Sequence, residues 1–250
     1  MARYDFRTSR LFVADPLVAG ARLALTSTQS NYLINVLRRR PGDTVLVFNG
    51  RDGEWRAKLD GAGRRQALLA VVEQTRPQPA PGDLHYLFAP LKAARLDYMV
   101  QKAVEMGATR LEPVITRHTQ VERTNLHRMR ANAIEAAEQC GILSIPEIAQ
   151  PLTLAQAIAA LDHSRLLVFC DEEADVSDPV AALAACRVAA IPMRLAVLIG
   201  PEGGFAPEER SMLRQHPRVV PLSLGPRILR ADTAAVAALA LVGAVIGDWR

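Results

Sequence analysis

A proline-rich segment divides the sequence into two stretches whose hydrophobic patterns differ. Residues 76–83 read RPQPAPGD, and such a segment favours an extended linker over a helix or a central strand. Before it, short β-branched runs lie between turn signals such as Pro41-Gly42-Asp43 and Asn49-Gly50, whereas after it short apolar runs alternate with longer helical patterns. The sequence therefore predicts two domains, residues 1–75 and 84–250, joined by this linker.

The first stretch has the pattern of a small β-barrel. Short apolar runs predict strands at 11–13, 44–48, 54–59 and 67–72. One helix, at about 28–38, is expected to interrupt these strands, because apolar residues recur there at helical spacing.

The second stretch has the pattern of an α/β domain. Apolar runs predict strands at 84–89, 111–115, 166–170, 195–200 and 219–222. Helical patterns predict helices at 93–106, 124–140, 154–161, 179–188, 207–214 and 231–246. Because strands joined through helices make right-handed crossovers, we expect a mostly parallel sheet. The apolar residues 234–247 fall short of the roughly 20 that a membrane span needs, so they indicate a buried helix.

Composition excludes several classes of protein. Half of the residues are hydrophobic and 22% are charged, which is typical of a globular chain rather than a disordered one. The three cysteines, Cys140, Cys170 and Cys186, have no C-x-x-C spacing and predict free thiols rather than a disulfide framework or a four-cysteine zinc site. The five histidines are too widely spaced to predict a metal site. The spacing of the cysteines and histidines therefore leads us to expect no bound metal. Since the first residues lack the apolar run of an export signal, we also expect a cytoplasmic protein.

The positive charge is concentrated in the first third of the chain. Residues 1–76 contain 13 Lys and Arg against 7 Asp and Glu, and much of this excess is arginine, including Arg38, Arg39 and Arg40. Arginine presents a planar pair of donors to a phosphate group, so the excess favours nucleic-acid binding. A solvated surface that keeps the protein soluble is the alternative explanation of the same charge.

Two segments late in the sequence each follow a predicted strand and have the composition of a ligand-binding loop. The first is LIGPEGGF at 198–205, and the second is LGPRILRADTA at 224–234. Glycines let a backbone approach a ligand closely, and ligands of an open parallel sheet bind beyond the carboxyl ends of its strands. Taken alone, Gly203-Gly204 is equally typical of a plain turn. No GxGxxG follows the first strand of the second domain, which counts against a nicotinamide enzyme.

Together, these two segments resemble the knot segments of the SPOUT methyltransferases and, within them, of the family of ribosomal RNA small subunit methyltransferase E. The segments QKAVEMG at 101–107 and AAEQC at 136–140 are similar to two further motifs of that family. RLFV at 10–13 and VLR at 36–38 are similar to its PUA-like RNA-binding domain. The resemblance covers essentially the whole chain.

The resemblance implies a fold and an activity. Within the α/β domain, residues at about 195–247 would form a deep trefoil knot, and residues 1–75 would form a PUA-like β-barrel. Members of the family methylate N3 of a uridine in 16S rRNA, use S-adenosylmethionine as the methyl donor, and complete the active site across a homodimer. The implied partners are therefore 16S rRNA or the small ribosomal subunit, and a second copy of the chain. The alternative is a non-catalytic rRNA-binding assembly factor of the same fold.

The resemblance also implies which residues form the site. The cofactor would be surrounded by Leu198, Ile199, Gly200, Pro201, Gly203, Leu222, Ser223, Leu224, Gly225, Ile228 and Leu229. Arg230 and Arg227 are candidates for stabilising the charge that develops on the uracil when N3 loses its proton, and Glu202 is the candidate for accepting that proton. Phosphate binding or a pair with Glu202 is the alternative for the arginines, and hydrogen bonds from neighbouring amides are the alternative for Glu202. RNA contacts are expected from Arg10, Arg38, Arg39 and Arg40.

Further positions similar to the family have supporting roles in this interpretation. Asp232 and Thr233 are expected to cap the last helix. Gln101 and Glu105 lie four residues apart on one helix and either support the site or form a surface pair. Glu138 is expected to support the cofactor loops. The sequence departs from the family in lacking an arginine shortly after Glu138-Gln139 and in having aspartate at 232, where glutamate is usual.

Overall fold

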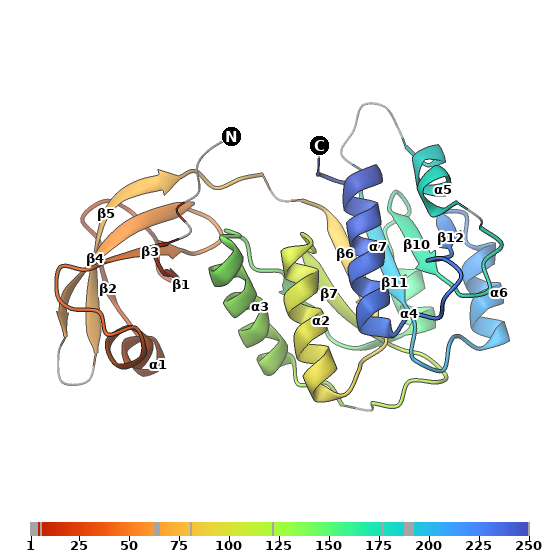
Figure 1. Ribbon diagram of the computed structural model, residues 1–250, viewed down its shortest axis with the longest axis horizontal. Coiled ribbons are helices and arrows are strands. Elements are labelled where there is room, and N and C mark those ends of the chain that lie inside the picture. Colours follow the sequence, from red (N-terminus) through yellow and green to blue (C-terminus); the bar gives the residue numbers. More distant parts are fainter. Residues whose placement is uncertain are drawn as a thin grey trace. The chain divides into compact units, whose positions relative to one another are not determined.

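The chain forms two compact units (Figure 1). The computed structural model describes residues 5, 7–62, 66–80, 82–121, 123–176, 178–187 and 193–249. The first unit comprises Met1–Pro81 and Ile134–Ile145, and the second comprises Gly82–Ala133 and Pro146–Arg250. The sequence placed residues 134–145 with the second domain, whereas in the structure this segment packs with the first unit.

The first unit contains a five-stranded sheet in the order β1-β3-β4-β5-β2. Its strands are β1 (Arg10–Phe12), β2 (Arg22–Ala24), β3 (Thr44–Phe48), β4 (Glu54–Ala62) and β5 (Ala67–Arg76). β1 pairs in parallel with β3, and the other pairs are antiparallel. Alternating residues such as Val45, Ala57 and Leu69 fill one core. The four predicted strands are confirmed. The sequence did not predict β2, because Leu23 is its single buried residue and gives no apolar pattern.

The helical segment of the first unit differs from the single helix predicted at 28–38. Helix α1 (Ser27–Asn31) continues directly into a π-helical turn at Tyr32–Val36. Thr26 starts it through a capping box, since its hydroxyl accepts from the Gln29 N–H (3.3 Å) and its own N–H donates to the Gln29 side chain (3.0 Å). Arg38 has a left-handed φ of +54°, so the helix ends before it.

The second unit is built on a seven-stranded sheet in the order β12-β10-β11-β6-β7-β8, with β9 paired to β7. Its strands are β6 (Leu84–Phe88), β7 (Arg110–Ile115), β8 (Glu147–Ile148), β9 (Leu152–Thr153), β10 (Leu166–Cys170), β11 (Leu195–Ile199) and β12 (Val219–Leu222). All of these pairs are parallel, which confirms the predicted sheet. The strands β8 and β9 have two residues each and are too short to produce a pattern.

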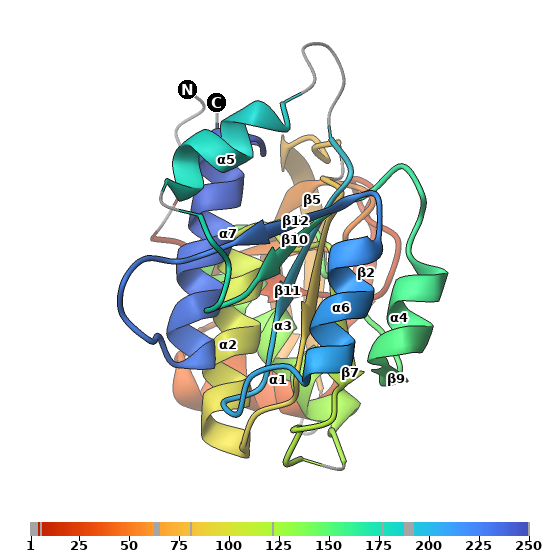
Figure 2. The same cartoon turned by 90° about the vertical axis from the view of Figure 1, so that its right-hand side faces the viewer.

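Helices cover both faces of this sheet (Figure 2). On one face, α2 (Ala93–Glu105) packs against α7 (Ala231–Val245), and α5 (Pro179–Ala185) contacts α7 in turn. On the other face lie α4 (Leu154–Ala160) and α6 (Pro207–Gln215). Helix α3 (Leu126–Cys140) begins in the second unit and ends in the first.

The apolar segment near the C-terminus forms the buried helix that the sequence predicts. Ala235, Ala238, Leu239 and Val242 of α7 are each no more than 1% exposed. In the described part of the chain, no helix has both the length and the apolar content to cross a bilayer. The predicted α/β class is confirmed, and the trefoil knot implied by the family resemblance stays a prediction.

Candidate active site

Three loops of the second unit leave the sheet at the same edge. β10, β11 and β12 are parallel neighbours, so the segments that follow them start close together. Backbone hydrogen bonds join the strand ends: the Asp171 N–H donates to the Leu222 carbonyl (3.1 Å), and the Ala89 N–H donates to the Ile199 carbonyl (3.0 Å). Both segments that the sequence singled out therefore emerge at the carboxyl edge, where an open parallel sheet binds its ligands.

The glycines after β11 are required by packing. A Cβ at Gly200 would lie 2.4 Å from the ring of Phe205, which is buried and packs edge-on against Phe169 with ring centroids 5.0 Å apart. Gly204 has a φ of +70°, and a Cβ there would lie 2.7 Å from Oε1 of Glu172. The segment therefore folds back onto its own phenylalanine and against the loop that follows β10, so it is not a plain turn.

Two side chains hold this glycine segment in place. His118 Nδ1 lies 3.1 Å from the carbonyl oxygens of both Gly203 and Gly204. Because both partners are acceptors, Nδ1 carries the proton and donates. At the start of α6, the carboxylate of Glu209 accepts from the Ala206 N–H (2.9 Å) and the Arg117 N–H (2.8 Å). These contacts fasten the loop after β7 to the loop after β11.

The loop after β10 is anchored by a buried carboxylate. The side chain of Asp171 is fully buried and accepts from Arg210 Nε (3.1 Å) and Arg214 Nη2 (2.8 Å), both on α6. Arg210 also pairs with Glu172 and Glu173 (both 2.6 Å). Removing a partner from a buried ion is costly, so this cluster fixes the loop on the α6 side of the sheet.

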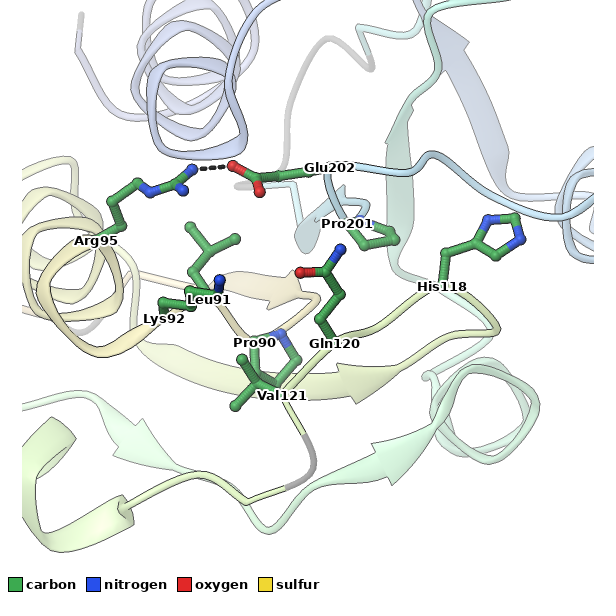
Figure 3. Close-up of a pocket in the computed structure, with 9 residues that line it drawn as sticks. All are labelled: Pro90, Leu91, Lys92, Arg95, His118, Gln120, Val121, Pro201 and Glu202. Atoms are coloured by element: carbon green, nitrogen blue, oxygen red, sulfur yellow. Dashed lines mark hydrogen bonds and ion pairs between the residues drawn. The ribbon is translucent and has the colours of Figure 1, made fainter.

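A cavity of about 320 Å³ lies beside the first glycine segment (Figure 3). The loops after β6, β7 and β11 and the first turn of α2 supply its walls, which are Pro90, Leu91, Lys92, Arg95, His118, Gln120, Val121, Pro201 and Glu202. Arg95 forms an ion pair with Glu202, which Figure 3 shows at the edge of the cavity. The Gln120 carboxamide points between Leu91 and Pro201, whereas the His118 ring points away. The walls are thus apolar at Pro90, Leu91, Val121 and Pro201, and polar or charged at the other five positions.

The predicted cofactor-binding residues occupy three different environments. Leu198, Ile199 and Leu222 are strand residues buried in the sheet. Gly200, Pro201 and Gly203 belong to the fastened segment after β11. The remaining five lie in the loop between β12 and α7, namely Ser223, Leu224, Gly225, Ile228 and Leu229. In that loop Gly225 has a φ of +100° with no atom within 4 Å of an added Cβ, and Ile228 is 94% exposed.

The predicted catalytic residues do not gather at the cavity. Glu202 lines it, whereas Arg227 and Arg230 are exposed in the loop before α7 and are not among its walls. Neither arginine side chain has an acidic partner among the described residues. Arg230 is the N-cap of α7 and caps it without a side-chain hydrogen bond. The expected capping by Asp232 and Thr233 is therefore wrong in position, and Asp232 instead lies in the first turn, where its charge complements the helix dipole.

Two titratable groups lie beneath these loops, the buried Tyr86 and the half-buried Cys170. The Tyr86 hydroxyl donates to the thioether of Met99 (3.0 Å), and burial raises the pKa of Tyr86 well above its usual value. Burial also raises the pKa of the Cys170 thiol to about 12. Both groups are neutral at physiological pH, so the floor of the site is uncharged at these positions.

The predicted RNA-binding arginines of the first unit differ in exposure. Arg10 does not lie on the surface: its side chain is 3% exposed, and its Nε donates to Glu54 (2.8 Å). Arg38 and Arg40 are exposed, whereas Arg39 is half-buried and donates to the Ser9 hydroxyl (3.1 Å). Expected RNA contact by Arg10 therefore conflicts with its burial, because a guanidinium committed to a buried carboxylate is not accessible to phosphate.

The family-like motif at 136–140 supports the first unit instead of the cofactor loops. The Glu138 carboxyl accepts from the Phe12 N–H (2.8 Å), and burial raises the pKa of Glu138 to about 7. Just after this motif, a Cβ on Gly141 would lie 3.3 Å from the guanidinium carbon of Arg10, and Arg76 donates to the Gly141 carbonyl (2.9 Å). On α2, the partner of Glu105 is Lys102 (2.7 Å), whereas the sequence had paired Glu105 with Gln101.

Among the polar residues that line the cavity, the sequence did not predict four: Lys92, Arg95, His118 and Gln120. A signal for them was available. Lys92 and Arg95 follow the strand predicted at 84–89, and His118 and Gln120 follow the strand predicted at 111–115. The rule that ligands bind at the carboxyl edge applies to these two strands as much as to the later ones.

Comparison with known proteins identifies relatives along almost the whole chain. Residues 78–243 match an RNA methyltransferase domain, and residues 25–72 match an RNA methyltransferase PUA domain, which confirms the predicted PUA-like unit. The ribosomal RNA small subunit methyltransferase E of Synechocystis sp. is 33% identical over 241 residues, covering 95% of this chain and 78% of that protein. The protein of the same name from Rickettsia conorii is 28% identical and covers 94% of both chains.

Solved structures share the fold. A Legionella pneumophila protein in complex with SAM is 30% identical, with a TM-score of 0.81 over 95% of this chain and 98% of that one. The ribosomal RNA small subunit methyltransferase E of Neisseria gonorrhoeae, bound to S-adenosyl methionine, is 24% identical, with a TM-score of 0.83 over 98% of this chain and all of that one.

Proposed function

The chain belongs to the ribosomal RNA small subunit methyltransferase E family, and on that premise we propose that it transfers a methyl group from S-adenosylmethionine to N3 of a specific uridine in 16S rRNA. The observation that carries the proposal is the carboxyl edge of the second unit, where two glycine-containing loops and a small cavity adjoin. A methyltransferase needs two adjoining sites, one for the cofactor and one for the base that receives the methyl group.

The loop between β12 and α7 fits S-adenosylmethionine. An adenosine ligand needs apolar faces for its base and free backbone groups for its edges. Ile228 offers a fully solvated apolar side chain, and the left-handed Gly225 leaves open space beside the backbone. Leu224 and Leu229 would add partly exposed apolar surface, and Gly200, Pro201, Gly203 and Ser223 would complete the site above the buried Leu198, Ile199 and Leu222. When bound, S-adenosylmethionine supplies an electrophilic methyl group.

The residues of the chain then have to ionise and hold the uracil. N3 of uridine bears an imide proton, and its loss spreads negative charge over the two flanking carbonyl oxygens. The guanidinium groups of Arg227 and Arg230, which have no acidic partner among the described residues, are proposed to stabilise this charge. Glu202 is proposed to accept the proton, since its carboxylate lies at the edge of the cavity.

The substrate and the assembly follow from the same premise. We propose that Arg38, Arg39 and Arg40 of the first unit contact rRNA phosphates, because Arg38 and Arg40 are exposed next to a left-handed turn. A homodimer is proposed on the same family premise, and a second copy would cover apolar side chains such as Tyr98 (46% exposed) and Trp249 (50% exposed). The proposed setting is the cytoplasm, where ribosomes are assembled.

The test is to incubate the purified protein with isotopically labelled S-adenosylmethionine and small ribosomal subunits that lack the modification. The rRNA is then digested, and the labelled nucleosides are identified by mass spectrometry. We expect labelled 3-methyluridine. A different labelled nucleoside would overturn the target assignment, whereas no label from a protein that binds the cofactor would favour the non-catalytic assembly factor.

A further inference from the structure

The cavity in the second unit adjoins the glycine segment after β11 but has walls that the cofactor loops do not supply. Pro201 and Glu202 belong to that segment, whereas the opposite walls come from the loops after β6 and β7. A ligand in this cavity would therefore contact the segment that flanks the proposed cofactor site. This is the position that a methyl acceptor must occupy, and this inference rests on the proposed function.

The acceptor atom restricts how the uridine can be presented. N3 of a paired uracil donates its proton to the partner base, so it cannot be methylated within a duplex, and the base must be unpaired or extruded. Enzymes that modify a base inside structured RNA meet the same requirement.

The walls of the cavity suit both the flat faces and the polar edge of a nucleobase. Pro90, Leu91 and Pro201 are apolar and enclose the space into which the side chain of Gln120 points (Figure 3). Apolar walls of this kind pack against the faces of a planar ring. The Gln120 carboxamide has no hydrogen-bond partner among the described residues, so its amide hydrogens are free to bind a carbonyl oxygen of the base.

The basic side chains at the cavity match a phosphate group. Lys92 is exposed and has no acidic partner among the described residues. Arg95 pairs with Glu202, but their side chains are 32% and 43% exposed, and an ion pair in contact with water is weak enough to exchange. A nucleotide phosphate can therefore draw Arg95 away from Glu202.

We propose that this cavity binds one extruded uridine nucleotide, with its base between Leu91 and Pro201, a base carbonyl on the Gln120 carboxamide, and its phosphate on Lys92 and Arg95. Gln120 and Arg95 are then substrate-binding residues outside the two glycine segments. The exchange of Arg95 from Glu202 to the phosphate also releases the Glu202 carboxylate at the moment when the base arrives.

The test uses 5-fluorouridine 5′-monophosphate and ¹⁹F NMR, so that binding is measured apart from methylation. The wild-type protein should broaden the fluorine line. Gln120→Ala should weaken binding about 3- to 10-fold, the loss of one hydrogen bond, and Arg95→Met about 10-fold or more, the loss of a charge-assisted contact. The matched controls are Gln150→Ala and Arg187→Met, which replace exposed residues of the second unit outside the cavity and should bind as the wild type does.

Kinetics with unmodified small subunits provide a second readout. Arg95→Met should raise KM, while Gln120→Ala should lower kcat, because the base carbonyl gains negative charge in the reaction. Unchanged binding and kinetics in both variants would overturn the cavity assignment even if the wild type forms 3-methyluridine. Conversely, residue-dependent nucleotide binding by a protein that forms no 3-methyluridine would support the cavity and refute the proposed function. Thermal unfolding verifies that each variant is folded.

Discussion

The loops after β11 and β12 leave the same edge of the same sheet but are built in opposite ways. The segment after β11 is fastened: His118 holds the carbonyls of Gly203 and Gly204, and Phe205 fills the space that Gly200 leaves. In the loop after β12, Gly225 borders open space and Ile228 is 94% exposed. The first segment is therefore a preformed wall, whereas we propose that the second obtains its contacts from a ligand or a second subunit.

The first prediction concerns the reactivity of Cys170, the last residue of β10 beneath the fastened loops. With a pKa of about 12, its thiolate at pH 8 is roughly a thousandfold rarer than that of an ordinary thiol, so alkylation should be slower by about that factor. Iodoacetamide labelling read by mass spectrometry measures it, with the exposed Cys140 as the internal reference. Equal labelling rates for the two thiols in the folded protein would contradict the raised pKa of Cys170.

The second prediction concerns the anchor of the loop after β10. Arg210→Met leaves the buried Asp171 carboxylate with Arg214 and the Glu173 N–H as its remaining partners and should lower the free energy of unfolding by about 3 kcal/mol. Denaturant titration measures this loss. Arg187→Met, at an exposed position of the same unit, is the control and should change stability by less than about 0.5 kcal/mol. Similar midpoints for the two variants would contradict the anchor.

The third prediction concerns the need for space in the glycine segment after β11. Gly200→Ala places a methyl group 2.4 Å from the Phe205 ring and should cost about 2 kcal/mol of stability. The control is Gly82→Ala, whose added Cβ would meet Thr109 at an ordinary 3.7 Å. Thermal unfolding compares them, and a Gly200→Ala protein as stable as its control would mean that the segment is not fixed by its phenylalanine.

The fourth prediction concerns the loop between β12 and α7 and has the smallest expected effect on stability. Ile228→Ser should leave the free energy of unfolding within about 0.5 kcal/mol, since the side chain is exposed. It should weaken S-adenosylmethionine binding roughly tenfold, the effect of burying one isoleucine against the ligand. Calorimetric titration measures the affinity, and Val36→Ser, at an exposed position of the first unit, is the control. Unaltered affinity would remove Ile228 from the cofactor site.

Periodic patterns in the sequence predicted the elements that are long and regular. The strands at 166–170 and 219–222 lie where the apolar runs placed them, and the parallel sheet follows from their alternation with helices. The π-helical turn at Tyr32–Val36 was not predictable, because its residues also satisfy an α-helical spacing and tertiary packing decides between the two.

Roles that depend on distant partners were the hardest to predict. Arginine is a residue type that commonly binds phosphate, yet Arg10 is buried because its guanidinium pairs with Glu54, 44 residues away. The motif around Glu138 predicted a role in supporting the cofactor loops. Its carboxyl instead accepts from the Phe12 N–H, 126 residues away. Conversely, the cavity residues Arg95 and Gln120 were predictable in principle from their position just beyond strand ends, although they carry no motif of their own.

Hydrogen–deuterium exchange of the two loops, with and without S-adenosylmethionine, tests the difference between them most directly. We expect slow exchange at Gly204 and Ala206 in both states, because their N–H groups are hydrogen-bonded in the free protein. We expect rapid exchange at 223–230 in the free protein and clear protection once the cofactor is bound. Protection of 223–230 without cofactor, or no change in that loop at saturating cofactor, would contradict the assignment of this loop as the cofactor site.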